Sequence, residues 1–185
     1  MAAVSLGPWL GLRAALLLAR GRPEGAFLIS MEQPNEQATR ARHSFLAMLF
    51  CVPIFLVIQD LGKADLGIAS VREFASFVLA WLGYAVFSYH LASVMGRAED
   101  WPRFIVLWNW SNLVQCLLMT CALIPALFGA PPIIGQTGWV VAMGWSLWLQ
   151  WSATRIGLVL PAGRAALMVA ADMALGMVVL RLTAG

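Results

Sequence analysis

Five long apolar segments, separated by short polar connections, constrain this chain more than any other feature. They run over about 41–59, 74–95, 104–128, 139–158 and 165–180. A helix of about 20 mostly apolar residues crosses the hydrocarbon core of a bilayer. Because 61% of the residues are hydrophobic and 11% are charged, a soluble domain of 185 residues could not hide so much apolar surface. We therefore predict an all-α polytopic membrane helix bundle with five transmembrane helices over residues 41–185.

Residues 1–40 are expected to form a cytoplasmic segment that precedes the first span. Trp9 and its leucine neighbours alternate with Arg13 and Arg20, a pattern that suits a helix lying in the headgroup plane. The alternative is a poorly ordered tail. Trp101 and Trp139 lie where tryptophans anchor a span at the inner and the outer membrane surface. The predicted interface anchors are thus Trp9, Arg13, Arg20, Trp101 and Trp139.

The basic residues predict the orientation, because positively charged loops stay in the cytoplasm. With the N-terminus inside, nine of them lie on the cytoplasmic side and three on the other. The nine are Arg13, Arg20, Arg22, Arg40, Arg42, Arg97, Arg103, Arg155 and Arg164, and the three are Lys63, Arg72 and Arg181. We predict a protein of the cell inner membrane with a cytoplasmic N-terminus and a periplasmic C-terminus.

Polar residues inside the spans are costly, so their positions are informative. Asp172 falls in the middle of the fifth span, on the same side as the small residues Ala165 and Gly176. It is expected to face protein rather than lipid, either as a structural contact between helices or as a functional ionisable group. In the fourth span, Trp151 and Arg155 are one turn apart, a spacing suited to a cation–π contact.

Amide side chains mark the third and fourth spans. In the third span they recur every three residues within an arc of about 120°, and in the fourth they belong to the polar stripe Ser146, Gln150 and Thr154. They serve either as contacts between helices or as the lining of a polar cavity. Placed by depth, seven residues are expected to form one intramembrane polar cluster between the midplane and the cytoplasmic face: His90, Asn109, Asn112, Gln115, Gln150, Arg155 and Asp172.

Several chemistries have no support in the residue pattern. There is no metal-ligand spacing of Cys and His, no nucleophile elbow, no phosphate-binding glycine loop and no pair of carboxylates. We expect no cofactor and no metal; bis-histidine haem would need His43 and His90 as a facing pair at matched depth. The net charge of +3 is small and not clustered, so nucleic acid is not an expected partner. The three cysteines are expected to be reduced packing residues.

The stretch HLASVMGRAEDWPRFIVLWNWSNL (90–113) resembles bacterial members of the Yip family of small five-span membrane proteins. Met95, Gly96, the short loop through Trp101 and then Phe104 match the glycine, polar loop and aromatic-rich third span of that family. The resemblance implies a cytoplasmic N-terminal segment followed by five spans, and it implies no catalytic activity. The doubled glycine of the family appears here as Gly96-Arg97, and the acidic motif of the eukaryotic members is missing.

These features predict a non-catalytic integral membrane protein, an accessory or scaffold component that binds the lipid bilayer and other membrane proteins or itself. The alternative is a small proton- or solute-linked transporter or channel that uses Asp172 and the amides of the third and fourth spans. A membrane-embedded enzyme or haem protein is the third reading.

Overall fold

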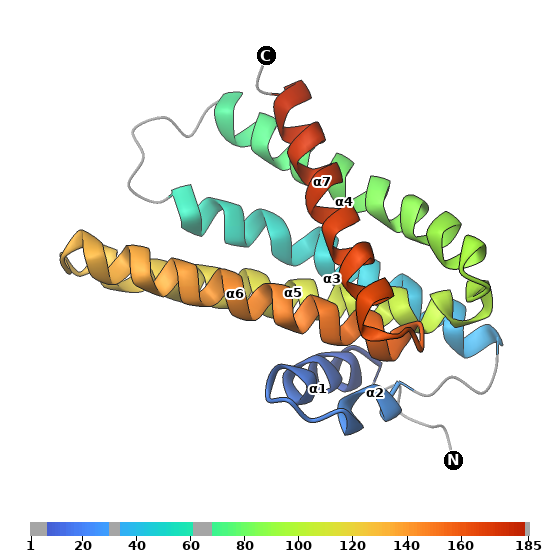
Figure 1. The fold of residues 1–185 in the computed structure, drawn as a ribbon. Helices are drawn as coiled ribbons and strands as arrows, with labels where there is room; N and C mark the ends of the chain where they lie inside the picture. Colours follow the sequence, from blue (N-terminus) through green and yellow to red (C-terminus); the bar gives the residue numbers. More distant parts are fainter. Residues whose placement is uncertain (1–6, 30–33, 61–67, 184–185) are drawn as a thin grey trace.

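The computed structural model describes residues 7–29, 34–60 and 68–183, and these are folded into helices with no strand among them. The predicted all-helical fold is therefore confirmed. The helices, shown in Figure 1, are α1 Gly7–Ala19, α2 Glu24–Phe27, α3 Pro34–Asp60, α4 Ile68–Val94, the 3-10 turn η1 Ala98–Asp100, α5 Trp101–Leu127, α6 Pro132–Gly157 and α7 Ala162–Thr183.

Four of the described helices are long and apolar enough to cross a membrane. The spanning segments are Glu36–Ile58, Val71–Val94, Ala98–Ala126 and Ala162–Thr183, on α3, α4, α5 and α7. The prediction of a membrane protein is thus confirmed for these four. Helix α6 has 26 residues, about 39 Å at 1.5 Å per residue. It is less apolar because it carries four tryptophans together with glutamine, serine, threonine and glycine, and its crossing stays a prediction.

Helix α5 lies at the centre of the bundle. Eight consecutive side chains, from Phe104 to Ser111, are buried, and a helix covered on every side needs neighbours all round. These are α3 and α6, which flank it in one layer, with α1 on one face and α4 on the other (Figure 1). Gly157 lets α6 come close, since a Cβ there would lie 2.9 Å from the Cα of Phe104.

Helices α4 and α7 pack against each other and tilt away from the layer of α3, α5 and α6, which we call the central layer (Figure 1). Two hydrogen bonds join the α4–α7 pair. The Ser76 hydroxyl donates to Thr183 Oγ1 at 2.7 Å, and the Tyr84 hydroxyl donates to the Met168 carbonyl at 3.0 Å. The hairpin of α5 and α6 extends past this pair on one side, so the two halves of the bundle form a V.

The N-terminal helices pack on the face of the central layer opposite the α4–α7 pair (Figure 1). Ala14, Ala15 and Leu18 of α1 are fully or almost fully buried, and a Cβ added to Gly11 would overlap the indole ring of Trp110. Such a close approach is possible only for glycine. Helix α1 is therefore integrated into the bundle along α5. Its predicted position in the headgroup plane stays a prediction.

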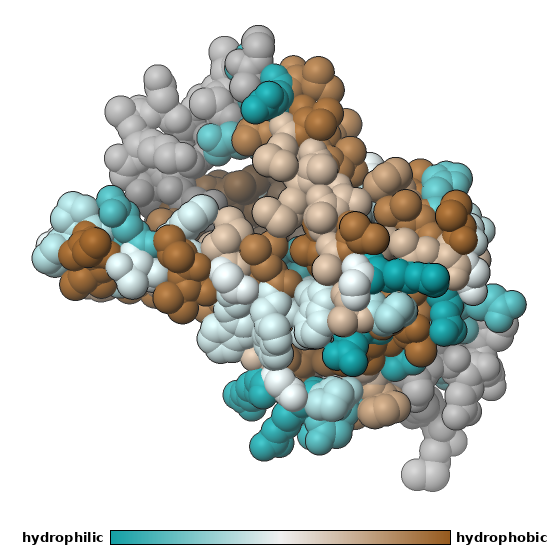
Figure 2. Space-filling view, in the orientation of Figure 1, coloured by the Kyte–Doolittle hydropathy of each residue, from teal (hydrophilic) through white to brown (hydrophobic). Residues whose placement is uncertain are grey.

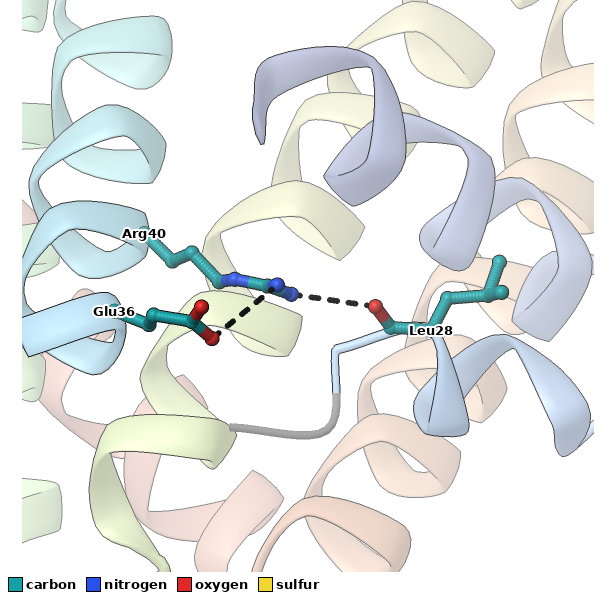
Figure 3. A network of polar contacts seen from close by, with 3 residues as sticks. All are labelled: Leu28, Glu36 and Arg40. Atoms are coloured by element: carbon teal, nitrogen blue, oxygen red, sulfur yellow. Dashed lines mark hydrogen bonds and ion pairs between the residues drawn. The ribbon is translucent and has the colours of Figure 1, made fainter. Parts of the chain in front are cut away.

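A polar contact ties α2 to the start of α3. Arg40 donates a hydrogen bond to the Leu28 carbonyl at 3.3 Å and lies 3.8 Å from the Glu36 carboxylate (Figure 3). One guanidinium thus holds the end of the N-terminal helical pair against the first turns of α3. Of the predicted segment 1–40, residues 1–6 and 30–33 lie outside the described residues, as does Lys63 of the orientation count.

Candidate binding groove in the helix bundle

The polar stripe of α6 faces inward, as its spacing predicts. Ser146, Gln150 and Thr154 are all buried, and the Thr154 hydroxyl donates to the Gln150 carbonyl at 2.8 Å. The Gln150 amide Nε2 donates to the carboxyl group of Asp172 on α7. Asp172 therefore faces protein, as predicted, and its contact joins α6 of the central layer to the α4–α7 pair.

A groove of about 470 Å³ lies between the two halves of the bundle, and Gln150 and Asp172 are part of its lining. Helices α4, α5, α6 and α7 all contribute side chains to it. Its polar residues are Asn112, Gln115, Ser146, Gln150 and Asp172. Its walls are apolar and rich in methionine, with Met119 and Met143 on one side and Met173 and Met177 on the other. Figure 2 shows the molecule hollowed beside α7.

Two contacts besides Gln150–Asp172 join α4 to α5 next to this groove, through the lining residues Trp81 and Trp108. The Trp81 indole N–H of α4 donates to Asn109 Oδ1 of α5 at 2.8 Å, and the rings of Tyr84 and Trp108 lie with their centroids 5.1 Å apart. Trp108 also approaches Asp172, but its indole N–H makes no hydrogen bond that meets normal geometry. These contacts, together with Gln150–Asp172, join the α4–α7 pair to the central layer.

Three side chains that line the groove have a buried polar atom without a hydrogen-bond partner among the described residues. They are Gln115, through its Nε2, Ser146, through its hydroxyl, and Trp108, through its indole N–H. Ser146 is only 4% exposed. A buried donor without a partner costs about 1–3 kcal/mol, so such groups are normally satisfied by water or a ligand. Gln115 and Ser146 also line a second, smaller cavity of about 150 Å³ beside Ala19 and Arg20 of the N-terminal segment.

Asn109 belongs to a different contact from the other amides of α5. It is fully buried, accepts the hydrogen bond of Trp81 and donates from Nδ2 to the Ser44 hydroxyl of α3 at 3.0 Å. An arc of about 120° is wide enough for the first and last amide to face different neighbours. Asn109 therefore joins α3, α4 and α5, whereas Asn112 and Gln115 line the groove.

His90 and Arg155 also lie outside the groove. His90 is exposed on α4 beside the Tyr89 ring, 5.8 Å between centroids. Arg155 is exposed and lies 5.3 Å from the centroid of the Trp151 ring, which confirms the predicted cation–π contact. Both side chains sit near the C-terminal ends of their helices, where long or polar groups reach water. Of the seven residues of the predicted cluster, the structure brings together Asn112, Gln115, Gln150 and Asp172.

The predicted interface anchors occupy different surroundings. Trp9, Arg13, Arg20 and Trp139 are exposed, a position that suits an anchor. Trp101 is half-buried, and its indole N–H donates to the Ser88 hydroxyl of α4 at 3.1 Å. It therefore also fixes the turn between α4 and α5, together with the Arg97–Asp100 ion pair at 3.3 Å.

The sequence does not predict the methionine walls of the groove, because methionine is a common apolar packing residue in a span. The sequence predicts Ser146 only as a member of the polar stripe and does not indicate that its hydroxyl lacks a partner. Within residues 7–29, 34–60 and 68–183 no three or more His, Cys, Asp or Glu side chains gather as metal ligands, and the three cysteines are free.

No protein-family model, no curated protein and no solved structure matches this chain. The resemblance of residues 90–113 to the Yip family therefore stays a prediction.

Proposed function

We propose that the chain is a five-span protein of the cell inner membrane, with its N-terminus in the cytoplasm and α6 as the additional span. Helix α6 runs antiparallel to α5 along its length, and α5 is apolar enough to cross. At about 39 Å, α6 exceeds the hydrocarbon thickness of about 30 Å. The excess of basic residues in the cytoplasmic connections supports the orientation.

In this membrane the protein acts as a non-catalytic accessory or scaffold component that binds another membrane protein. The observation that carries this proposal is the outer face of α6. Ile134, Val141, Trp145 and Trp148 recur there at heptad-like spacing and are all exposed, the two tryptophans by 42% and 40%. Tryptophans prefer the membrane surface or a protein contact over the hydrocarbon. Trp145 donates a hydrogen bond to the Ala19 carbonyl of α1 at 3.1 Å, and the parts of both rings that stay exposed are available to a partner.

The partner is a transmembrane helix, because an apolar stripe of this spacing accepts the side chains of a second helix. The test is purification of the tagged protein in a mild detergent after in vivo cross-linking from a photoreactive residue at Val141. We expect a discrete adduct with a membrane protein or with a second copy of this chain, and its loss in the variant Trp148→Ala. The matched control is Leu167→Ala, an exposed apolar position of α7. A monomer free of adducts would contradict the proposal.

The groove favours a second candidate, a small proton- or solute-linked transporter. Five polar side chains, Asn112, Gln115, Ser146, Gln150 and Asp172, line one groove inside the helix bundle. Ionisable residues within spans mark transport paths in many membrane proteins. Proton flux into proteoliposomes tests it. A proton flux that disappears in Asp172→Asn supports transport. If the wild-type protein gives no proton flux, the transporter candidate is wrong and the accessory role remains the proposal.

A further inference from the structure

We propose that the groove between α4, α5, α6 and α7 is a binding site for an uncharged lipid whose head carries a hydroxyl or carbonyl group. This goes beyond the accessory role and does not depend on it. The head lies against Asp172 and Gln150, and the chain lies between the methionine walls. The occupant follows from the size of the groove, the hydrogen-bonding groups at its base and the absence of a cation in its lining.

Size disfavours a helix as the occupant. One turn of α-helix, about 10 Å wide and 5.4 Å tall, fills roughly 420 Å³, and the whole groove measures about 470 Å³. The groove therefore has room for about one turn, and a partner helix would lie mostly outside it. Pockets for small ligands range over about 300–1,000 Å³, so the volume suits a single chain with a compact head.

The base of the groove offers hydrogen bonds in both directions. Gln115 Nε2 and the Ser146 hydroxyl are buried donors without a partner among the described residues, and they suit an oxygen that accepts. The Asp172 carboxyl accepts from Gln150 and is approached by the Trp108 indole. Because a carboxylate has about four acceptor sites, it can also accept from an O–H of the lipid head. A hydroxyl does both, and a head with a neighbouring carbonyl satisfies the second donor.

Charge excludes a phosphate-bearing head. Among the described side chains that line the groove none is cationic, and one is a carboxylic acid. A phosphate there would lie next to Asp172 with no Arg or Lys to neutralise it, in a medium where unpaired charges are costly. The head is therefore neutral.

The walls suit a flexible hydrocarbon chain. From Asp172 the groove follows α7 past Met173 and Met177 to Leu180, eight residues or about 12 Å of helix. On the opposite side it passes Met119 and Met143. Methionine adapts to irregular apolar surfaces, as a mobile chain requires.

Gly176 provides a direct test. It lines the groove, and a Cβ at this position meets no atom within 4 Å, so Gly176→Leu adds a side chain at the groove with no clash at its Cβ. Gly144 is the matched control: it is an exposed helical glycine of α6, its added Cβ also meets nothing within 4 Å, and it does not line the groove. Both variants gain similar helix propensity.

The probe is a fatty alcohol with a diazirine on its chain, added to the full-length protein in proteoliposomes and photolysed. We expect labelled peptides from α5 and α7 that include Met119 and Met173, a loss of at least about fivefold in Gly176→Leu, and unchanged labelling in Gly144→Leu. Gln115→Leu, which removes one donor, is expected to weaken labelling by about fivefold, as for one lost hydrogen bond. Helical circular dichroism and gel filtration confirm that each variant is folded.

Three results would overturn the assignment. The first is equal labelling of Gly176→Leu and the wild-type protein. The second is equal labelling by a probe with the same chain and a phosphate head. The third is a polypeptide that cross-links to the groove and blocks its labelling by the probe when this protein is present at its natural level. That result would mean that the occupant is a protein.

Discussion

Gln150 of α6 donates a hydrogen bond to the carboxyl group of Asp172 on α7, and this contact joins the central layer to the α4–α7 pair at the base of the groove. The two residues are 22 positions apart in sequence and belong to consecutive helices. The Trp108 indole of α5 also approaches Asp172, but Gln150 is the donor that meets hydrogen-bond criteria.

This contact predicts unequal effects of two substitutions. Gln150→Leu leaves the Asp172 carboxyl without its donor and is expected to lower the free energy of unfolding by about 1 kcal/mol, the usual size of a hydrogen bond between membrane helices. Asp172→Asn keeps an acceptor oxygen for Gln150 and is expected to cost less than half of that. Unfolding by sodium dodecyl sulfate in mixed micelles measures both. A larger cost for Asp172→Asn would show that the carboxyl group has a partner besides Gln150.

The two amides at the middle of α5 are expected to differ in the same assay. Asn109→Leu removes the acceptor of the Trp81 indole N–H and the donor to Ser44, and it is expected to destabilise the protein by about 1–3 kcal/mol. Asn112→Leu, one turn away on the groove side, is the matched control and is expected to cost clearly less. Equal costs would mean that the three-helix contact of Asn109 contributes little.

The packing of α1 on α5 depends on Gly11. Its substitution by Ala forces the Trp110 ring, which is 5% exposed, to move, and overpacking of this kind costs about 1–3 kcal/mol. We expect α1 to detach and trypsin to cleave after Arg13 and Arg20 several times faster in Gly11→Ala. Gly163→Ala serves as the control, because its added Cβ meets nothing within 4 Å. An unchanged cleavage rate in Gly11→Ala would mean that other contacts of α1 hold it against α5.

The membrane character of the chain follows from sequence because it depends only on local composition over about 20 residues. Features that depend on spacing within one helix could also be predicted from the sequence. Trp151 and Arg155 are one turn apart and are in contact. The stripe of Ser146, Gln150 and Thr154 lies on one face and is buried. Periodicity along a helix determines which side chains share a face.

The pairing of helices could not be predicted in the same way. Depth in the membrane grouped Asn109 with Gln115 and with His90, but depth leaves the rotation of each helix and the choice of its neighbour undefined. The structure turns Asn109 toward α3 and α4 and leaves His90 exposed. Likewise, the pattern of Trp9 and Arg13 predicts an amphipathic helix, but nothing local indicates that Gly11 lies against Trp110, 99 positions later.

The crossing of α6 is the prediction on which the orientation of the whole groove depends. If α6 spans the membrane, its two ends lie on opposite sides, since about 39 Å of helix passes the hydrocarbon core once. Single cysteines at Ala130, before α6, and at Gly163, after it, test this in a background with Cys51, Cys116 and Cys121 replaced by Ala. A membrane-impermeant maleimide is expected to label the Ala130→Cys variant in intact cells and the Gly163→Cys variant only after permeabilisation. Labelling of both from the same side would mean that α6 does not cross, and the reverse pattern would keep the crossing but invert the protein.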